Sequence, residues 1–547
     1  MIDDQIDISI NLKRKNHENG MTLKEYSDGV IEGNLPILTC DEYTKQFGVL
    51  ENEALQVLEW GRANNLTIID DNLSMIRSMA LIKYQGTFTQ FNELFNIGLR
   101  VVSSGDRIYH THDNDITMPQ EIKDVVVSIF GLDNSRILES NNISEDTIED
   151  INSMSIIPSA NISNPTPIDL ALAYKAPRTQ AGNFSQGRGA TVAIVGLVGG
   201  WTAQNLTSSF SRIGLSSPIN NITDIRIYNE PGNDPSSPYS SRLMYDLYII
   251  GSIVPAAKIL IYYHRNREWA ISEAINYILF DNNQPRASVI NISMSWTISE
   301  LNFDPSVLAA CEEALQTAVI LGVTVVVPSG SSGSQYGSEC LYPASSPYVL
   351  CCGGTTATID TTYNIVNEVV WNGGSSSSGG GVSSTFSRPT WQEGRTSKSY
   401  QENLVEELSG RGFPDIAAMA AGYTFYHGTS NTLITMSGNS APLITGLIAR
   451  INQMTGERVG FVNPFLYSID NNYIAPFRDI TSGNNATTNP DGYIATTGWD
   501  ACTGLGSMQA GRVYRLKHTG ETYPRANLGT RPIVGQAYPR ITTGVRY

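Results

Sequence analysis

The 547-residue chain has few cysteines and no long apolar run. These two absences argue against a disulfide-rich protein and against a membrane-spanning protein. Its six cysteines contain no Cys-x-x-Cys pair and are too few for a disulfide scaffold, so we expect buried thiols and leave one disulfide open. No run of about 18 apolar residues occurs, so no membrane span is expected. The first twenty residues lack the apolar core of a signal peptide, which predicts an intracellular protein or a component of an assembled particle.

Positive charge is also scarce. The chain carries 36 Lys and Arg against 52 Asp and Glu, which gives a net charge of −16. Proteins that bind nucleic acid present basic surfaces to phosphate, so this balance argues against nucleic acid as a main partner. A hydrophobic share of 41% over this length predicts a globular protein of two or three domains.

Composition and periodicity divide the chain into five segments. They are an N-terminal arm (1–35), an α+β unit (36–140), an Asn/Ser-rich linker (141–165), a large domain (166–516) and a Tyr/Arg-rich tail (517–547). In the α+β unit we expect helices over 40–48, 51–65, 88–97 and 122–134, and strands over 66–71 and 75–87.

The large domain alternates apolar strands with amphipathic helices. Expected strands are 190–197, 258–264, 288–296 and 323–330, and expected helices are 241–253, 267–279 and 305–322. This alternation predicts an α/β fold with a parallel sheet covered by helices on both faces. Functional sites of such sheets lie at the carboxyl ends of the strands.

The tail contains a near repeat, "YPRANLGTRP" at 523–532 and "YPRITTGVRY" at 538–547. It has too few apolar side chains to form a core, so one alternative is a disordered tail. Tyr and Arg are favoured at protein interfaces. The other alternative is a strip that binds other proteins of an assembly through Tyr523, Arg525, Tyr538 and Arg540.

Ordered segments across residues 36–516 resemble the sedolisins, the acid-acting serine-carboxyl peptidases of kumamolisin type (family S53). The resemblance rests on segments that include "SIFGLDN", "SVINISMSW", "GGGVSSTFSRPTWQ", "RINQMTGERVGFVNPFLY" and "GWDACTGLGS". It implies a subtilisin-like α/β domain preceded by a ferredoxin-like α+β prodomain.

The resemblance also implies a Ser nucleophile, a Glu base, an Asp behind that Glu, and an Asp at the oxyanion hole. The family's Glu-x-x-x-Asp helix falls on Arg242 and Asp246, and its oxyanion Asp falls on Ser331. The family's "G-G-T-S-A-x-A-P-L" motif, aligned without a gap through Pro442, places Gly438 at the nucleophile.

These replacements predict a loss of catalysis. Arginine stays protonated and cannot act as a base, and Gly438 cannot form an acyl-enzyme. Ser331 could still donate one hydrogen bond to an oxyanion. Arg242 and Asp246 lie four residues apart on a predicted helix, so we expect an ion pair between them.

Ser440 is the alternative nucleophile, because "GNSA" resembles the family's "GTSA". Its use requires a two-residue shift along the helix, which would turn the side chain by about 200°. His264 lies near a strand end but is expected to be an ordinary histidine rather than part of a Ser-His-Asp triad.

The resemblance further implies one structural Ca²⁺ site. Its ligands would come from Asp479, Ile480, Thr496, Gly498 and Asp500. Two carboxylates with several carbonyl oxygens suit a hard cation such as Ca²⁺.

Three hypotheses for function follow. The leading one is a catalytically inactive pseudopeptidase with a structural or scaffolding role. The Asn/Ile-rich composition favours an AT-rich genome such as that of a large DNA virus, so a virion component is one version of this hypothesis. The alternatives are an active acid endopeptidase that uses Ser440, and a decoy or inhibitor that binds peptide without cleaving it.

Overall fold

The computed structural model describes most of the chain. The described residues are 5–104, 107–137, 145–148, 161–163, 165–178, 186–237, 239–293, 298–334, 340–421, 423–426, 433–436, 440–470, 475–487 and 491–519. The tail repeats therefore lie outside the described residues. Among those described, no helix combines the length and the apolarity that crossing a bilayer would require. All six cysteines are buried free thiols, which confirms that expectation.

The N-terminal domain is an antiparallel sheet in the strand order β2-β3-β1-β6, covered by helices. Its strands are β1 (Gln5–Leu12), β2 (Thr67–Ile68), β3 (Leu81–Thr87) and β6 (Val126–Phe130), with a separate hairpin of β4 (Leu99–Ser104) and β5 (Arg107–His112). Its helices are α1 (Leu23–Ile31), α2 (Cys40–Phe47), α3 (Glu51–Ala63), α4 (Leu73–Met79) and α5 (Phe88–Phe95). Capping boxes begin α1, α2 and α5, where Thr22, Thr39 and Thr87 bind the third helical residue.

Three predictions for this domain are wrong. Residues 1–35 are not a separate arm, because β1 is an inner strand of the sheet, between β3 and β6. Alternate isoleucines of β1, at 6, 8 and 10, point into the core. Residues 122–134 do not form the expected helix. They contain the strand β6, in which a run with β-branched residues pairs with β1. The strand expected over 75–87 begins only at Leu81, after α4.

The large domain contains a ten-stranded sheet in the order β22-β23-β19-β13-β12-β11-β8-β10-β9, with β14 paired to β13. The strands from β9 to β19 in this order are parallel, as predicted. The strands are β8 (Thr191–Gly196), β9 (Ile222–Arg226), β10 (Lys258–Tyr263), β11 (Val289–Asn291), β12 (Thr324–Pro328), β13 (Leu350–Ile359), β14 (Ile365–Val370), β19 (Ile416–Ala421), β22 (Phe477–Arg478) and β23 (Ser507–Met508).

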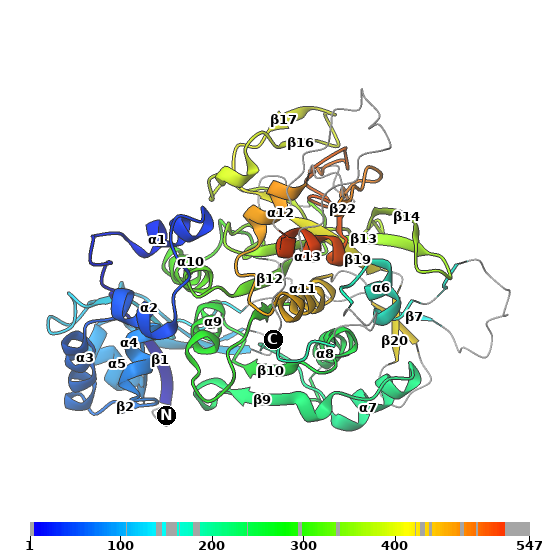
Figure 1. Cartoon of the computed structure of the whole chain (residues 1–547). Coiled ribbons are helices and arrows are strands. Elements are labelled where there is room, and N and C mark those ends of the chain that lie inside the picture. The colour runs from blue at the N-terminus through cyan, green and yellow to red at the C-terminus, as the bar shows by residue number, and fades with distance from the viewer. Residues whose placement is uncertain are drawn as a thin grey trace, which may run out of the picture.

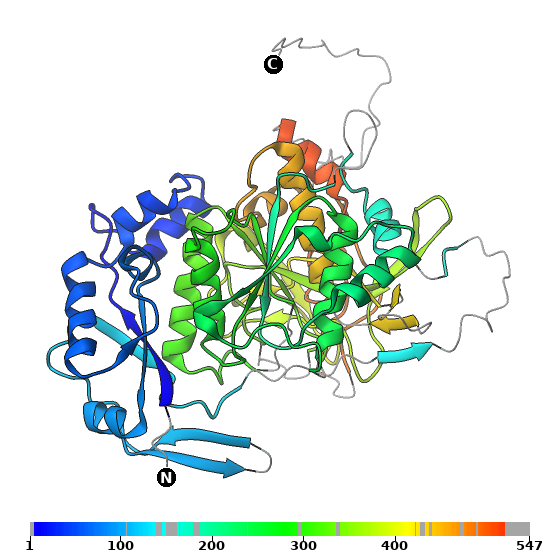
Figure 2. The same cartoon turned by 90° about the horizontal axis from the view of Figure 1, so that it is seen from below.

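Helices cover both faces of this sheet (Figures 1 and 2). They are α6 (Pro167–Ala173), α7 (Ala203–Arg212), α8 (Ser240–Ile253), α9 (Ala270–Phe280), α10 (Pro305–Ile320), α11 (Ala441–Thr455), α12 (Asn463–Ile469) and α13 (Ala510–Thr519). Along β8, Val192 and Ile194 pack with α8 and α11, whereas Ala193 and Val195 pack with α9 and α10. The strand is apolar throughout because both of its faces are buried.

The N-terminal domain packs against the α9/α10 face of the large domain. Figure 1 shows α1 beside α10, and α2 and α4 beside α9. Tyr43, Phe47 and Met79 of the N-terminal domain belong to the same buried cluster as residues of α9 and α10. The two domains therefore share one apolar core at their junction.

Short strands complete the large domain. They are β15 (Gly381–Val382) with β18 (Gly412–Phe413), β16 (Thr396–Lys398) with β17 (Val405–Glu407), and the antiparallel sheet β20-β21-β7. In the last, β20 (Tyr423–Tyr426) and β21 (Leu433–Met436) pair with β7 (Glu145–Ile148). The predicted linker 141–165 thus contributes a strand to the large domain.

Candidate active site

The candidate site lies at the carboxyl ends of β11 and β12, beside α8 and the start of α11. Arg242 and Asp246 project from α8, Ser331 follows β12, and Ser440 precedes the first residue of α11. The Thr445 hydroxyl of α11 donates to Asn291 Oδ1 at the end of β11, at 3.0 Å. The structure thus gathers the described family positions at the edge of the sheet where sites of this fold are expected.

Arg242 does not form the predicted ion pair with Asp246. Its Nη2 donates instead to the backbone carbonyl of Ser293, just beyond β11. Its Nε is buried without a hydrogen-bond partner among the described residues. Burial lowers the pKa of Arg242, and the charge of Asp246 opposes that shift. A guanidinium held in this way cannot accept a proton from a nucleophile.

Asp246 is buried, and one of its carboxyl oxygens, Oδ1, has no hydrogen-bond partner among the described residues. Burial raises the pKa of Asp246 to about 7, although the charge of Arg242 and a hydrogen bond from the Ser293 side chain both lower it. Asp246 therefore sits in an environment that favours its neutral form.

Replacing Asp246 by asparagine is expected to flatten the pH dependence of stability. The folded-state pKa, about 7, exceeds the ordinary value of 3.8, so the folded protein keeps a proton that the unfolded chain releases. The contribution of Asp246 to the free energy of unfolding therefore falls as pH rises from about 4 to 7, by up to about 4 kcal/mol. Urea denaturation across this range should show a smaller slope for Asp246→Asn. The exposed Asp115→Asn should keep the wild-type slope, and equal slopes in all three proteins would contradict the prediction.

Ser440 is poorly placed for nucleophilic attack. Its side chain is 1% exposed, and its hydroxyl donates to the Gly353 carbonyl of β13 at 2.7 Å. No acidic or basic side chain of the described residues hydrogen-bonds to it. A hydroxyl turned into the sheet, without a base, lacks what a serine nucleophile requires.

The other two family positions are less fully defined. Ser331 is half-buried, and its carbonyl accepts a hydrogen bond from the Ser377 backbone N–H at 2.9 Å. Gly438 lies outside the described residues. Met436, the last residue of β21, is two positions before it.

The segment between the two domains runs along the strand that leads to Gly438. β7 pairs antiparallel with β21, with Met436 opposite Glu145 and Leu433 opposite Ile148. The composition of 141–165 gave no sign of this pairing, because the segment lacks a period-two pattern. The structure therefore places strand β7 of the linker beside β21 of the large domain.

Two of the predicted metal ligands bind the same turn. Asp479 Oδ2 accepts from the Gly498 N–H at 3.0 Å, and Asp500 Oδ2 accepts from the Thr496 N–H at 3.1 Å. The carboxyl of Asp500 is fully buried, and burial raises its pKa to about 7. A cation beside it would supply the opposite charge that this environment lacks. Asp479 and Asp500 thus bring two carboxyl groups to one turn, and carboxylate oxygen is a ligand that suits a hard cation.

An ionic cluster, which sequence reasoning missed, joins the two domains and is buried except for Arg265, whose side chain is 50% exposed. Lys83 Nζ of β3 lies 3.2 Å from Glu230 Oε1 and 3.3 Å from Glu273 Oε2. His264 Nε2 contacts Glu273 Oε2 at 2.9 Å, and Arg265 Nε contacts Glu230 Oε2 at 2.5 Å. Burial disfavours the charged Lys83, but Glu273 and Glu230 outweigh it and raise its pKa. We call these five residues the junction cluster.

The fold and the position of the site define a subtilisin-like peptidase architecture with an N-terminal prodomain. A family model described as "Pro-kumamolisin, activation domain" matches residues 2–135, and one described as "Subtilase family" matches residues 228–459. Kumamolisin of Bacillus sp. is 32% identical over 482 residues, which cover 85% of this chain and 83% of kumamolisin. Sedolisin of Pseudomonas sp. is 27% identical over 504 residues, covering 86% and 80% of the two chains.

A solved structure agrees with these matches. Pseudomonas sedolisin, described as a serine-carboxyl proteinase complexed with two molecules of pseudo-iodotyrostatin, superposes with a TM-score of 0.55 at 27% identity. The match covers 66% of this chain and 100% of that one. This chain belongs to the sedolisin family of peptidases and carries the family's prosegment.

Proposed function

We propose that this member of the sedolisin family is a pseudopeptidase, with a structural role in place of catalysis. The observation that carries the proposal is Arg242, which stands at the position of the family's base and binds the Ser293 carbonyl. Glycine at position 438 removes the nucleophile as well. Base and nucleophile act as a unit, so losing both leaves no route to an acyl-enzyme.

Two contacts support retention of the prodomain. Lys83, Glu230 and Glu273 of the junction cluster are buried between the domains, and β7 of the linker pairs with β21 of the large domain. A chain that does not cut itself would keep both contacts. The prodomain would then serve as a permanent structural domain.

The scaffolding part of the proposal rests on the tail. Tyr523, Arg525, Tyr538 and Arg540 would attach the protein to other proteins of an assembly, and a virion is one candidate assembly. A peptide-binding decoy is a second candidate function, because β21 already accepts one extended strand, β7, along its edge. The active enzyme that uses Ser440 is less well supported, since its hydroxyl is bound to Gly353.

Intact mass tests the loss of catalysis. The purified full-length protein, incubated from pH 3 to pH 7, is expected to keep its mass of 59.7 kDa at every pH. A cut between about 150 and 165 that Ser440→Ala abolishes would overturn the proposal in favour of the active enzyme. A cut that persists in Ser440→Ala would point to a contaminating peptidase.

We also propose that Ca²⁺ binds between Asp479 and Asp500, with backbone carbonyls of Ile480, Thr496 and Gly498 as further ligands. The ion would join two loops and keep Asp500 ionised. After treatment with a chelator, Ca²⁺ at 100 times its Kd is expected to stabilise the protein by about 2.7 kcal/mol. Thermal denaturation should show a higher Tm for the wild type but not for Asp500→Asn. An equal rise in both proteins would exclude this site.

A further inference from the structure

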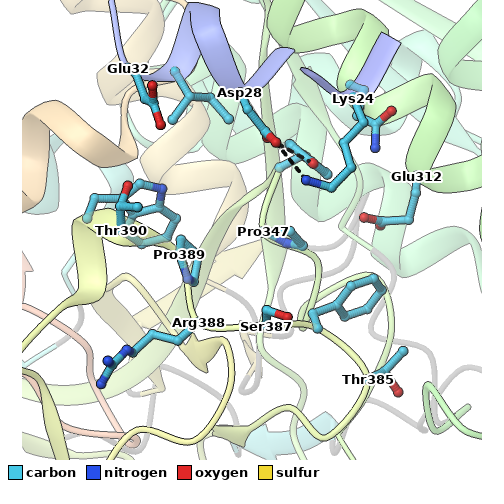
Figure 3. A pocket seen from close by; sticks show the side chains of 15 residues that line it. Lys24, Asp28, Glu32, Glu312, Pro347, Thr385, Ser387, Arg388, Pro389 and Thr390 are labelled. Carbon is cyan, nitrogen blue, oxygen red and sulfur yellow. Dashed lines mark hydrogen bonds and ion pairs between the residues drawn. The ribbon is translucent and has the colours of Figure 1, made fainter. Parts of the chain in front are cut away.

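A pocket of about 500 Å³ lies between the prodomain and the large domain. Helix α1, helix α10 and the segment 385–391 line it (Figure 3). Of the described family positions, Arg242, Asp246 and Ser331 do not line this pocket. It is therefore separate from the candidate active site, and we call it the junction pocket.

One part of the junction pocket is aromatic. Tyr348, Phe386 and Trp391 line it together with Pro347 and Pro389. The ring of Trp391 packs on Tyr467 of α12 at 4.7 Å between centroids, which fixes its position. Aromatic and proline side chains of this kind stack well on a tyrosine or a proline of a ligand.

The other part of the junction pocket is acidic. Lys24 is neutralised by Asp28, at 2.6 Å, and Arg388 pairs with Glu407 outside the pocket. Figure 3 shows Arg388 extending away from Lys24 and Asp28. It also shows Glu32 and Glu312 at separate places on the wall of the pocket.

Glu32 and Glu312 have no ion-pair partner in the part of the chain that the structure describes. Glu32 accepts from the Asn34 amide, and Glu312 accepts from the Tyr342 hydroxyl at 3.0 Å. Both retain acceptor capacity for a guanidinium, and burial raises the pKa of Glu312 to about 7 because no opposite charge pairs with it among the described residues. The junction pocket therefore suits a peptide with one aromatic residue, a proline and an arginine.

The chain itself carries such a peptide twice. Tyr-Pro-Arg occurs at 523–525 and at 538–540. The segment that bears it, 520–547, contains four arginines and one acidic residue, Glu521, against a net charge of −16 for the whole chain. Its charge thus complements the carboxylates of the junction pocket.

The tail also begins near the junction pocket. α13 ends at Thr519, and Lys517 Nζ lies 5.0 Å from the Phe465 ring of α12. Tyr467 of the same helix packs on Trp391 of the junction pocket. The end of α13 and the junction pocket are therefore separated by α12, which is about 10 Å across. The four residues to Tyr523 span at most about 14 Å, and the nineteen residues to Tyr538 about 65 Å. At least the second motif can reach the pocket.

We propose that the junction pocket holds one Tyr-Pro-Arg motif of the chain's own tail. The tyrosine stacks against Phe386 and Trp391, and the arginine binds Glu32 or Glu312. A tail attached so close presents its motif at a high effective concentration, which favours the chain's own pocket over a neighbour's. One pocket accepts one motif, so the other motif stays available for a partner protein. This inference does not depend on the loss of catalysis.

Photo-crosslinking of the full-length chain tests the inference. Benzoylphenylalanine replaces Tyr523 in one protein, Tyr538 in a second, and the exposed Tyr400 in a control. After irradiation, the 523 or the 538 protein is expected to crosslink to peptides that contain 24–32 or 385–391, at the mass of a single chain. The control protein should give no such crosslink.

A matched pair of variants tests the role of charge. Glu32→Gln combined with Glu312→Gln is expected to reduce the crosslink to the level of the Tyr400 control, whereas the exposed Glu59→Gln should leave it unchanged. The inference is overturned if neither tail position crosslinks to the junction pocket. It is also overturned if pocket crosslinks occur only between two chains, because the occupant is then a second copy.

Discussion

Replacing Lys83 by methionine is expected to destabilise the folded protein by about 3–5 kcal/mol, because it leaves two buried glutamates short of a partner. The side chain of Lys83 is 3% exposed, and those of Glu230 and Glu273 are 4% and 2% exposed. Glu273 would retain His264, and Glu230 would retain Arg265. Urea denaturation at pH 7 measures the loss, and limited proteolysis should show faster cutting between the domains.

Two variants separate this effect from a general one. Lys24→Met removes an exposed ion pair, in which the side chains of Lys24 and Asp28 are 65% and 40% exposed. This substitution should lower the free energy of unfolding by less than about 1 kcal/mol. Lys83→Met combined with Glu273→Gln removes a buried charge as well and should recover part of the loss. If Lys83→Met cost no more than Lys24→Met, the junction cluster would not hold the domains together.

The junction cluster should also survive mild acid. Burial disfavours the charged Glu273, but Lys83 and His264 outweigh it and lower its pKa to about 2, against an ordinary value of 4.5. A carboxylate with a depressed folded-state pKa contributes stability that is present above about 4.5 and is lost as pH falls toward 2. The interface is therefore expected to persist at the moderately acidic pH at which Asp246 favours the folded state.

The sequence was most informative where one local pattern decided the structure. The apolar runs that became β8 and β10 predicted a buried parallel sheet, and both strands are parallel and buried on both faces. The strand β1 was missed because its isoleucines alternate with Asp7, Ser9 and Asn11, which left it looking like a polar terminus. Strand β6 was predicted as a helix because, among the described strands, it pairs only with β1, and β1 was itself not recognised as a strand.

The site shows a different limit. Helical spacing put Arg242 and Asp246 on one face of α8, but spacing could not reveal that a carbonyl 51 residues away would take the guanidinium. The same holds for the junction cluster, whose members at 83, 230 and 273 meet only through the docking of two domains. Contacts that form only through tertiary packing produce no regular spacing of residues in the sequence, so they cannot be predicted from such spacing.

Restoring the family residues is expected to create peptidase activity. Arg242→Glu would place a carboxyl one helical turn from Asp246, where the two acids can share a proton. Ser331→Asp and Gly438→Ser would supply the oxyanion-hole acid and the nucleophile. Because nucleophile and base act as a unit, each single substitution should stay inactive, and the gain, up to about 10⁶-fold, should require the combination.

Intact mass after incubation at acidic pH detects the gain as cleavage between the prodomain and the large domain. The matched control carries Arg242→Glu, Ser331→Asp and Gly438→Ala, which restores everything except the nucleophile, and should stay uncut. A triple variant that folds with native circular dichroism but stays uncut would show that these three positions alone do not account for the loss. Cleavage by the triple variant, with an intact wild type, would locate the loss of catalysis in the residues that the sequence singled out.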